Sequence, residues 1–284
     1  MSTVLPAVSP SRTAVLLNGT NYLGLPRRHA VMTENAPHRV ETSRKTIRVL
    51  DALREHGSSS VTFLARELDM NKSTVHNHLS TLEAEKFVVR DGTDYDLSLR
   101  LLGFGGYVQH RHPLYQVAKR EVHRLASQTG ELANLMVEEY GQGVYLASEQ
   151  GERAVDLDIY PGLRRPLHAI GLGKAILAHL PPERVDDIID EHGLPAETDQ
   201  TITDRAELDA QLATVRDRGY AVDNEELIRG LRCVGAPIIA KDGTVLGAIS
   251  VSQPVSRMNN ERFTDEVPDI VQSAANVIEL HANH

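Results

Sequence analysis

The chain has 284 residues, of which 41% are hydrophobic and 24% charged, which is enough for two globular domains with a core each. No apolar run approaches the roughly 18 to 20 residues that span a bilayer, and the N-terminus lacks the order of a signal peptide. The single cysteine, Cys233, excludes an internal disulfide. We therefore expect a cytoplasmic protein that has no membrane segment.

The net charge of −9 at first argues against a protein that binds DNA, but the charge is unevenly distributed. Residues 1–42 carry a net charge of +2, residues 43–108 are neutral, and residues 109–284 carry −11. The acidity belongs to the C-terminal part, which need not contact phosphate. The charge pattern therefore leaves the N-terminal part free to bind nucleic acid.

Residues 1–40 have no hydrophobic periodicity and are rich in Ser, Pro, Asn and Thr. Such a composition cannot bury a core, so we predict a disordered tail over residues 1–40. Met32 precedes a polar stretch that leads into the first predicted helix. Translation could therefore begin either at Met1 or at Met32.

Three short helices are predicted next, and each is bounded by a residue that can cap or stop it. They span 43–56, 63–68 and 72–85, with Ser43, Thr62 and Asn71 as N-caps and Gly57 as the stop of the first. We expect Ile47, Leu50 and Leu53 to face inward from the first helix, and Val75, Leu79 and Leu82 from the third.

Two short strands follow, 87–90 and 95–97, on either side of the turn signal Asp91-Gly92. Three helices followed by a two-stranded wing is the order of elements in a winged helix-turn-helix. We therefore assign residues 41–98 to a domain of this kind.

From residue 99 the chain alternates between helical and strand-like segments. A linker helix over 99–112, interrupted by Gly103, Gly105 and Gly106, precedes an amphipathic helix over 113–127. The predicted strands are 132–140, 144–148, 155–160, 231–239 and 245–252, and further helices follow Gly171 and Pro182 and span 205–217 and 261–280. Antiparallel hairpins interspersed with helices favour an α+β domain over residues 113–284.

The third predicted helix has the side chains expected of a helix in the major groove of double-stranded promoter DNA. Near its start, Lys72, Ser73 and Thr74 are suited to phosphate contacts. His76, Asn77 and His78 are candidates for base edges, and an Asn can pair with adenine through two hydrogen bonds. The remaining candidate DNA contacts are Arg44, Lys45, Thr62 and Arg90.

A polar helix face is often merely solvated, and a winged helix can also dock on protein. In that alternative the chain would be a metabolite-binding sensor or enzyme whose N-terminal domain mediates protein contacts. The complete order of helices and wing favours DNA binding.

Several ordered blocks of sequence carry a family resemblance. In the N-terminal part they are Ser73-Thr74-Val75-His76, Leu79 and Leu82; in the C-terminal part they are Pro166-Leu167-His168-Ala169, Gly171-Leu172-Gly173-Lys174-Ala175, Thr198, Thr201-Ile202-Thr203, Gly219-Tyr220-Ala221, Glu225-Glu226, Gly230, Ala236-Pro237-Ile238 and Ser250-Val251-Ser252. Over nearly all of residues 43–282 the chain resembles the IclR family of bacterial and archaeal regulators. The resemblance implies a GAF-like effector-binding domain, a homodimer or homotetramer, and control of genes of carbon-compound metabolism through a small organic acid or sugar-derived effector.

The resemblance also implies an effector pocket, and the local chemistry agrees with it. The implied residues are Gly171, Leu172, Asp223, Leu231, Cys233, Ser250 and Ser252. Gly171 precedes a helix, whose N-terminal N–H groups favour an anion such as a carboxylate. Ser250 and Ser252 alternate along a strand and so share one face, and Met136 could supply an adaptable apolar wall. Alternatively, such serines lie at a surface and a lone cysteine is a core residue.

Catalytic, metal and cofactor sites are not expected. The block around Lys174 lacks the spacing of a nucleotide-binding P-loop, so Lys174 is expected to face solvent or to pair with a carboxylate within the fold. The histidines lack the spacing of a zinc site, and neither Cys233 nor His168 lies in a recognisable catalytic motif. We predict a regulator that is not an enzyme.

Overall fold

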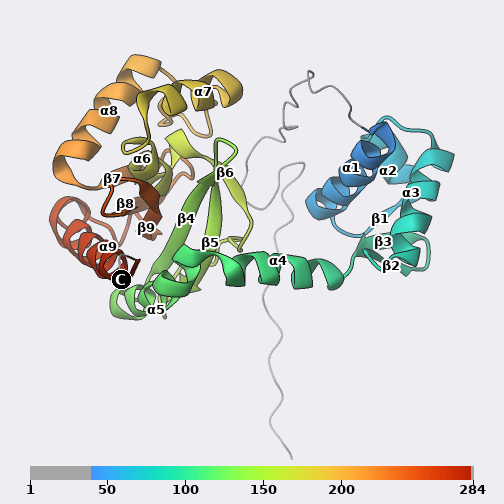
Figure 1. Cartoon of the computed structure of the whole chain (residues 1–284), viewed down its shortest axis with the longest axis horizontal. Coiled ribbons are helices and arrows are strands. Elements are labelled where there is room, and N and C mark those ends of the chain that lie inside the picture. Colours follow the sequence, from blue (N-terminus) through green and yellow to red (C-terminus); the bar gives the residue numbers. More distant parts are fainter. Residues whose placement is uncertain (1–39, 283–284) are drawn as a thin grey trace, which may run out of the picture.

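The computed structural model describes residues 40–282, which form a smaller N-terminal and a larger C-terminal domain joined by a single helix (Figure 1). The tail predicted for residues 1–40 lies outside the described residues, apart from Val40. Helices and antiparallel strands are mixed in both domains, so the predicted α+β class is confirmed.

The N-terminal domain is a winged helix-turn-helix. Its elements are α1 (Glu41–His56), β1 (Ser59–Ser60), α2 (Val61–Glu67), α3 (Lys72–Ala84), β2 (Val88–Asp91) and β3 (Asp94–Leu97). The strands form an antiparallel sheet in the order β1-β3-β2. Val75, Leu79 and Leu82 of α3 are buried against the other helices, as their spacing predicts.

Two of the predicted helix starts are wrong. The helix that Ser43 was expected to cap begins two residues earlier, after Val40, and Ile47 is 58% exposed instead of facing the core. The second helix is capped by Ser60, whose Oγ accepts a hydrogen bond from the Phe63 N–H at 3.3 Å. Ser60 has the extended backbone that an N-cap needs, whereas Thr62 already lies inside the helix.

The linker is one continuous helix, α4 (Arg100–Arg111), and not the interrupted helix expected from Gly103, Gly105 and Gly106. An interior glycine costs a helix about 1 kcal/mol but does not by itself break it. None of the residues of α4 is buried, and the helix bridges the two domains (Figure 1).

The C-terminal domain is built on a six-stranded antiparallel sheet in the order β6-β5-β4-β9-β8-β7. The strands are β4 (Leu132–Glu139), β5 (Gln142–Gln150), β6 (Arg164–Pro166), β7 (Ala221–Asn224), β8 (Leu231–Ile239) and β9 (Val245–Pro254). The helices α5 (Pro113–Thr129) and α9 (Val267–Ala282) cover one face. On the other face lies α6 (Gly171–Leu177), and its hydrophobic cluster includes α7 (Pro182–His192) and α8 (Arg205–Arg218).

Three differences from the sequence prediction concern this domain. Residues 155–160 are not a strand, and the strand β6 lies a few residues later. The short strand β7 was not predicted, and a π-helical segment, Arg262–Glu266, precedes α9, which begins at Val267. Residues 155–160 alternate in sequence like a strand, and their burial alternates too: Val155, Leu157 and Ile159 are half-buried, and Ile159 packs against the α6-side cluster.

Candidate DNA interface and effector site

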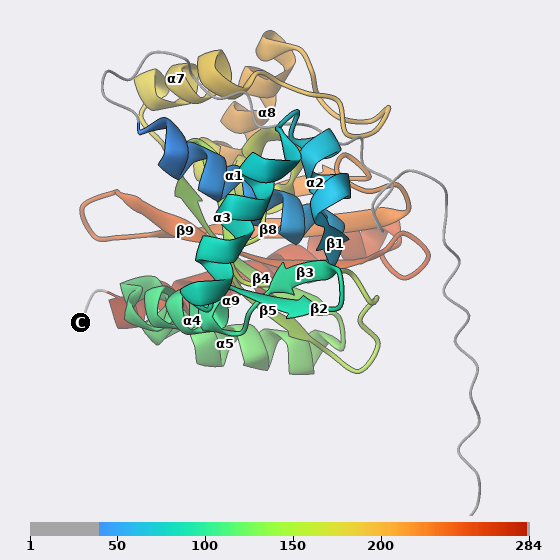
Figure 2. The same ribbon diagram turned by 90° about the vertical axis from the view of Figure 1, so that its right-hand side faces the viewer.

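The helix α3 lies on the side of the N-terminal domain that points away from the C-terminal domain (Figure 1; Figure 2). Lys72, Ser73, His76 and Asn77 are exposed, and Thr74 is half-buried. A partner that approaches α3 can therefore reach hydroxyl, amide, imidazole and ammonium groups near the start of the helix.

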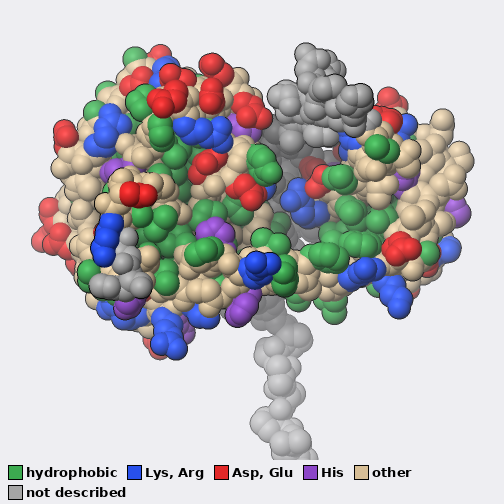
Figure 3. Space-filling model, viewed as in Figure 1, with side chains coloured by type: hydrophobic (Ala, Val, Ile, Leu, Met, Phe, Trp, Pro, Cys, Tyr) green, Lys and Arg blue, Asp and Glu red, His purple; other side chains and the backbone are tan. Residues whose placement is uncertain are grey.

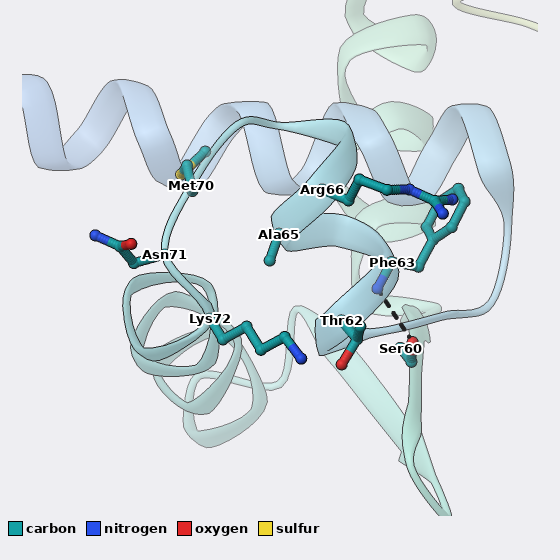
Figure 4. A pocket seen from close by; sticks show the side chains of 8 residues that line it. All are labelled: Ser60, Thr62, Phe63, Ala65, Arg66, Met70, Asn71 and Lys72. Carbon is teal, nitrogen blue, oxygen red and sulfur yellow. Dashed lines mark hydrogen bonds between the residues drawn. The ribbon is translucent and has the colours of Figure 1, made fainter.

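A hollow of about 570 Å³ separates the N-termini of α2 and α3 (Figure 4). The side chains of Thr62 and Lys72 both point into it, whereas Asn71 points away. Arg66 lies over the Phe63 ring, with its guanidinium carbon 5.5 Å from the ring centroid. A hydroxyl and an ammonium group that share one hollow suit an anionic group such as a phosphate.

Other predicted DNA contacts are partly engaged within the domain. Arg44 and Lys45 both pair with Glu41, at 2.9 and 3.9 Å. The Arg90 guanidinium donates a hydrogen bond to the Gly92 carbonyl at 2.9 Å in the wing. These interactions lie at the surface, where water competes with them and weakens them. A DNA phosphate could therefore replace the present partners of these side chains.

His78 does not lie free on the outer face of α3, where the sequence analysis put it. It is half-buried, and its Nδ1 lies 2.9 Å from the Thr46 hydroxyl of α1. The contact joins α1 to α3 and engages one imidazole nitrogen within the domain. The helical spacing places position 78 at the border of the packed face, one turn after Val75.

Most of the predicted effector residues lie on the face of the C-terminal sheet that α6 covers. The strand register brings Asp223, Cys233 and Ser252 into one cross-strand row. Ser250 and Asn134 lie next to each other in the neighbouring row. Side chains that share a row and a face are close neighbours, so five groups able to hydrogen-bond converge there.

The other predicted residues surround this polar group. Met136 lies opposite Ala248 on the same face, and Leu231 is two residues before Cys233, at the start of β8. Gly171 and Leu172 start α6, which rests directly on β8. A Cβ at Gly235 would come within 2.8 Å of the Leu172 nitrogen, so this close approach requires a glycine.

The Ser250 hydroxyl is fully buried and has no hydrogen bond of normal length and angle among residues 40–282; the group that it acts on is the Cys233 thiol, whose pKa it lowers. Ser148, in the same cross-strand row, by contrast donates to Asn134 Oδ1 at 2.8 Å. A buried polar group without a partner costs about 1–3 kcal/mol. Such a group is a candidate contact for a ligand that would satisfy it.

Burial controls the protonation of this cluster. It raises the pKa of the Asp223 carboxyl from 3.8 to about 7, against the opposing effect of the nearby Lys174 ammonium. Burial and the charge of Asp223 raise the pKa of the Cys233 thiol to about 11. Cys233 is therefore a neutral thiol at physiological pH, and Asp223 is poised to change charge with its surroundings.

Lys174 pairs with a carboxylate, which was one of the two expectations, and does not face solvent. Its Nζ lies 2.5 and 2.6 Å from the two carboxylate oxygens of Glu226, and both side chains are buried. The Thr201 hydroxyl donates to the Glu226 carbonyl at 2.6 Å. Three sequence blocks of the family resemblance, around Lys174, Thr201 and Glu226, thus meet beside Asp223. We call these three residues and their contacts the clamp.

Sequence reasoning did not single out Asn134 or Tyr145, both buried on the α6 side of the sheet. Asn134 lies two residues before Met136 on β4, so alternation along that strand could have placed it on this face, whereas Tyr145 lies on β5 and only the strand pairing places it there. No group of three His, Cys, Asp or Glu side chains in the described range could hold a metal ion. No helix of residues 40–282 is long and apolar enough to cross a membrane.

Comparison with known proteins identifies both domains. Residues 44–92 match the IclR helix-turn-helix domain, and residues 106–280 match the bacterial transcriptional regulator IclR C-terminal domain. The chain is 36% identical over 248 residues to the probable HTH-type transcriptional regulator ArcR of Halobacterium salinarum, covering 86% of this chain and 94% of ArcR. It is 34% identical over 232 residues to the regulator BhcR of Paracoccus denitrificans, covering 81% and 83% of the two chains.

A solved structure has the same architecture. The IclR protein of Thermotoga maritima is 28% identical and superposes with a TM-score of 0.71, covering 86% of this chain and 99% of that protein. Two family domains in the same order, and full-length relatives that are transcription regulators, settle the family. The chain belongs to the IclR family of transcriptional regulators.

Proposed function

We propose that the chain acts in the cytoplasm as a homo-oligomeric, effector-responsive regulator that binds promoter DNA and controls genes of carbon-compound metabolism. Residues 41–98 form the DNA-binding domain, 99–112 the linker, and 113–284 the effector-binding domain. The buried Ser250 hydroxyl, which has no hydrogen bond of normal geometry in the fold and only a weak thiol neighbour in Cys233, carries the proposal, because a ligand could supply the missing hydrogen bond there.

DNA contact is assigned to the outer face of α3. Lys72, Ser73 and Thr74 hold the phosphate backbone together with Thr62 across the hollow, and His76 and Asn77 read base edges. Because His78 is bonded to Thr46, we leave it out of the reading surface.

The effector site is assigned to the α6 side of the sheet. A small organic acid would accept a hydrogen bond from Ser250 and Ser252, beside the neutral thiol of Cys233 and the carboxyl of Asp223. Met136, Leu172 and Leu231 provide the apolar walls, and Gly171 lets α6 lie close to β8. Every predicted residue of this site is buried, so binding requires a local opening.

Assembly with a second copy is assigned to α4. Leu99, Leu102, Tyr107 and Val108 are all more than 60% exposed, and apolar surface continues from α4 onto the N-terminal domain (Figure 3). Isolated helices shorter than about 12–15 residues are marginal in water, and three glycines weaken α4 further. A partner helix would stabilise it and would pair two DNA-reading helices for two half-sites.

The DNA assignment is tested by fluorescence anisotropy with the DNA upstream of the protein's own gene, at two salt concentrations. Specific binding should survive scrambled competitor DNA and be lost to unlabelled specific DNA. If both competitors displace the probe equally, the contact is non-specific. That result would favour the alternative, in which the winged helix docks on protein.

The effector assignment is tested on the same complex with a panel of small organic acids and sugar acids. Ser250→Ala should abolish the effect of the active compound on DNA affinity and leave basal DNA binding unchanged. Ser127→Ala, an exposed serine on α5, is the matched control. A normal response from Ser250→Ala would move the effector site elsewhere.

A further inference from the structure

One arginine on the effector side of the sheet has no acidic partner. Arg165 lies on β6, is half-buried, and its guanidinium donates a hydrogen bond to the Arg164 carbonyl at 3.3 Å. No Asp or Glu of residues 40–282 lies within ion-pair distance of it, whereas Arg164 pairs with Glu139. A guanidinium without a carboxylate partner has N–H groups with which it can bind a further anion, and a carboxylate can accept two of them at once.

The strand register sets the direction of Arg165. It pairs with Gly143, and a Cβ at Gly143 would lie 2.4 Å from the Met136 sulfur and 3.1 Å from Leu167. Both neighbours belong to the hydrophobic cluster on the α6 side. Since paired residues share a face, Arg165 leaves the sheet on the effector side, and Arg164 leaves it on the opposite side.

The carboxylate that lies in the same cross-strand row as Arg165, that of Glu138, already has other hydrogen-bond partners. Glu138 pairs with Gly143 on its other side, so it lies in the same row as Arg165. Its Oε1 accepts hydrogen bonds from Arg184 of α7 and from the Gly141 N–H, both at 2.7 Å. Arg165 is thus left with its positive charge available on the α6 side.

Tyr145 lies between Arg165 and the Ser250 cluster. It is two residues from Gly143 on β5, is 4% exposed, and packs in the α6-side cluster. Burial and the charges of Cys233 and Asp223 raise the pKa of its phenol, and the positive charge of Arg165 opposes them. The Tyr145 phenol is therefore affected by charges on both sides of it, Asp223 and Cys233 on one and Arg165 on the other. It stays protonated and can donate a hydrogen bond.

We propose that Arg165 and Tyr145 form a second end of the effector site and that the effector is a small dicarboxylate. One carboxylate meets Ser250 and Ser252, and the other pairs with Arg165 and accepts a hydrogen bond from Tyr145. Across the sheet, β6 is three strands from β9, a spacing of about 14 Å at 4.7–4.9 Å per strand, and the row of Arg165 meets β4 at Glu138, four residues or about 13 Å from Asn134 in the row of Ser250. The arginine side chain and Tyr145, which lies between the two rows, must therefore span part of this distance for a small dicarboxylate to contact both ends. Even with the reach of the arginine side chain, a single carboxylate cannot contact both ends.

This inference rests on the proposed effector site, so the experiment separates the two. Isothermal titration calorimetry of the full chain compares succinate and glutarate with butyrate and pentanoate, which have the same chain lengths and one carboxylate. The variants are Arg165→Gln and Tyr145→Phe, with Arg164→Gln as the matched control on the opposite face and Ser250→Ala as the probe of the first end.

The wild type should bind a dicarboxylate at least tenfold more tightly than its monocarboxylate partner. Arg165→Gln should remove that preference and change monocarboxylate binding less than twofold, Tyr145→Phe should reduce the preference, and Arg164→Gln should keep it. If Ser250→Ala weakens binding but Arg165→Gln does not, the second end is wrong and the proposed effector site stands. If no acid of either series binds, or none is affected by Ser250→Ala, the dicarboxylate assignment and the proposed site both fail.

Discussion

The Lys174 ammonium is held by both oxygens of the Glu226 carboxylate, at 2.5 and 2.6 Å, with the lysine side chain fully buried and the glutamate 4% exposed. Lys174 belongs to α6, and Glu226 to the loop that follows β7. The pair therefore joins α6 to the end of the strand that carries Asp223. The pair fixes the walls of the candidate effector site.

Breaking this pair on one side should destabilise the C-terminal domain strongly. Lys174→Ala leaves the buried Glu226 carboxylate uncompensated, and the expected loss is about 3–5 kcal/mol of unfolding free energy in urea titrations. Lys174→Met combined with Glu226→Leu should lose less, because neither charge remains buried. The control, Arg205→Ala, breaks two exposed pairs with Asp186 and Asp209 and should cost no more than about 1 kcal/mol. Equal losses from the buried and exposed pairs would contradict the role of the clamp.

The pKa of Asp223 predicts a pH dependence of stability. Burial raises this pKa in the folded state to about 7, whereas the carboxyl titrates near 3.9 in the unfolded chain. The folded state therefore holds the proton more tightly, so the stability that Asp223 contributes is complete below about pH 4 and is lost as the pH rises through 7.

Asp223→Asn keeps an oxygen that can accept the Glu226 N–H, which lies 2.7 Å from Asp223 Oδ1, but it has no proton to lose. The variant should therefore gain stability relative to the wild type between pH 5 and pH 8, by up to about 4 kcal/mol at 1.36 kcal/mol per pKa unit. Urea unfolding at four pH values measures the difference. Parallel curves for the two proteins would mean that Asp223 does not titrate in this range.

The sequence predicted the elements whose signals are local. The apolar spacing of Val75, Leu79 and Leu82 gave the recognition helix, and Gly57 ended α1 as expected. Asn71 is the N-cap residue of α3, as predicted. The cap predicted for α2 was wrong because Ser60 and Thr62 are both good N-cap residues, and only the backbone leading out of β1 decides between them.

Long-range relationships could not be read from one sequence. Ser250 and Ser252 share a face by alternation alone, but their meeting with Asp223 depends on the strand order, in which β9 lies next to β8 and β8 next to β7. The bulge between Leu135 and Met136 shifts the pairing with β5, and it is this shift that places Tyr145 opposite Met136. The periodicity of the sequence indicates neither the strand order nor the position of the bulge.

The cap assignment makes a simple prediction for the N-terminal domain. Ser60→Ala removes the acceptor for the Phe63 N–H and should cost about 1 kcal/mol of stability. Thr62→Ala, at an exposed position inside α2, should change stability by less than about 0.5 kcal/mol. Thermal unfolding of the two variants compares them. A larger loss from Thr62→Ala would restore the threonine as the cap.

Residues of α3 should separate into contacts to phosphate, contacts to bases and packing contacts. Lys72→Ala should weaken binding to all DNA sequences alike and reduce the slope of log affinity against log salt by about 1. Asn77→Ala should cost about 1–3 kcal/mol on the specific site only. His78→Ala should lower the stability of the domain through the lost Thr46 contact and leave sequence preference unchanged. Anisotropy and thermal unfolding together distinguish these effects, and a change of sequence preference in His78→Ala would return it to the reading surface.

The surface of α4 predicts the assembly state. Leu102 and Val108 are 70% and 66% exposed, so replacing both by Asp should leave the fold of the single chain intact. The same change places charge in the proposed contact between copies, where desolvating it is costly. Sedimentation should therefore find the variant at the 31.3 kDa mass of one chain under conditions where the wild type is at least a dimer.

Leu280→Asp is the control, since Leu280 is 63% exposed on α9 and lies outside the proposed contact. Loss of assembly should also weaken binding to paired half-sites, because each chain then binds its half-site alone. If the α4 variant stays assembled while its fold is unchanged, the copies meet elsewhere, and the marginal stability of α4 would need another source. A variant that falls to single chains yet binds paired half-sites as tightly as the wild type would instead separate assembly from DNA recognition.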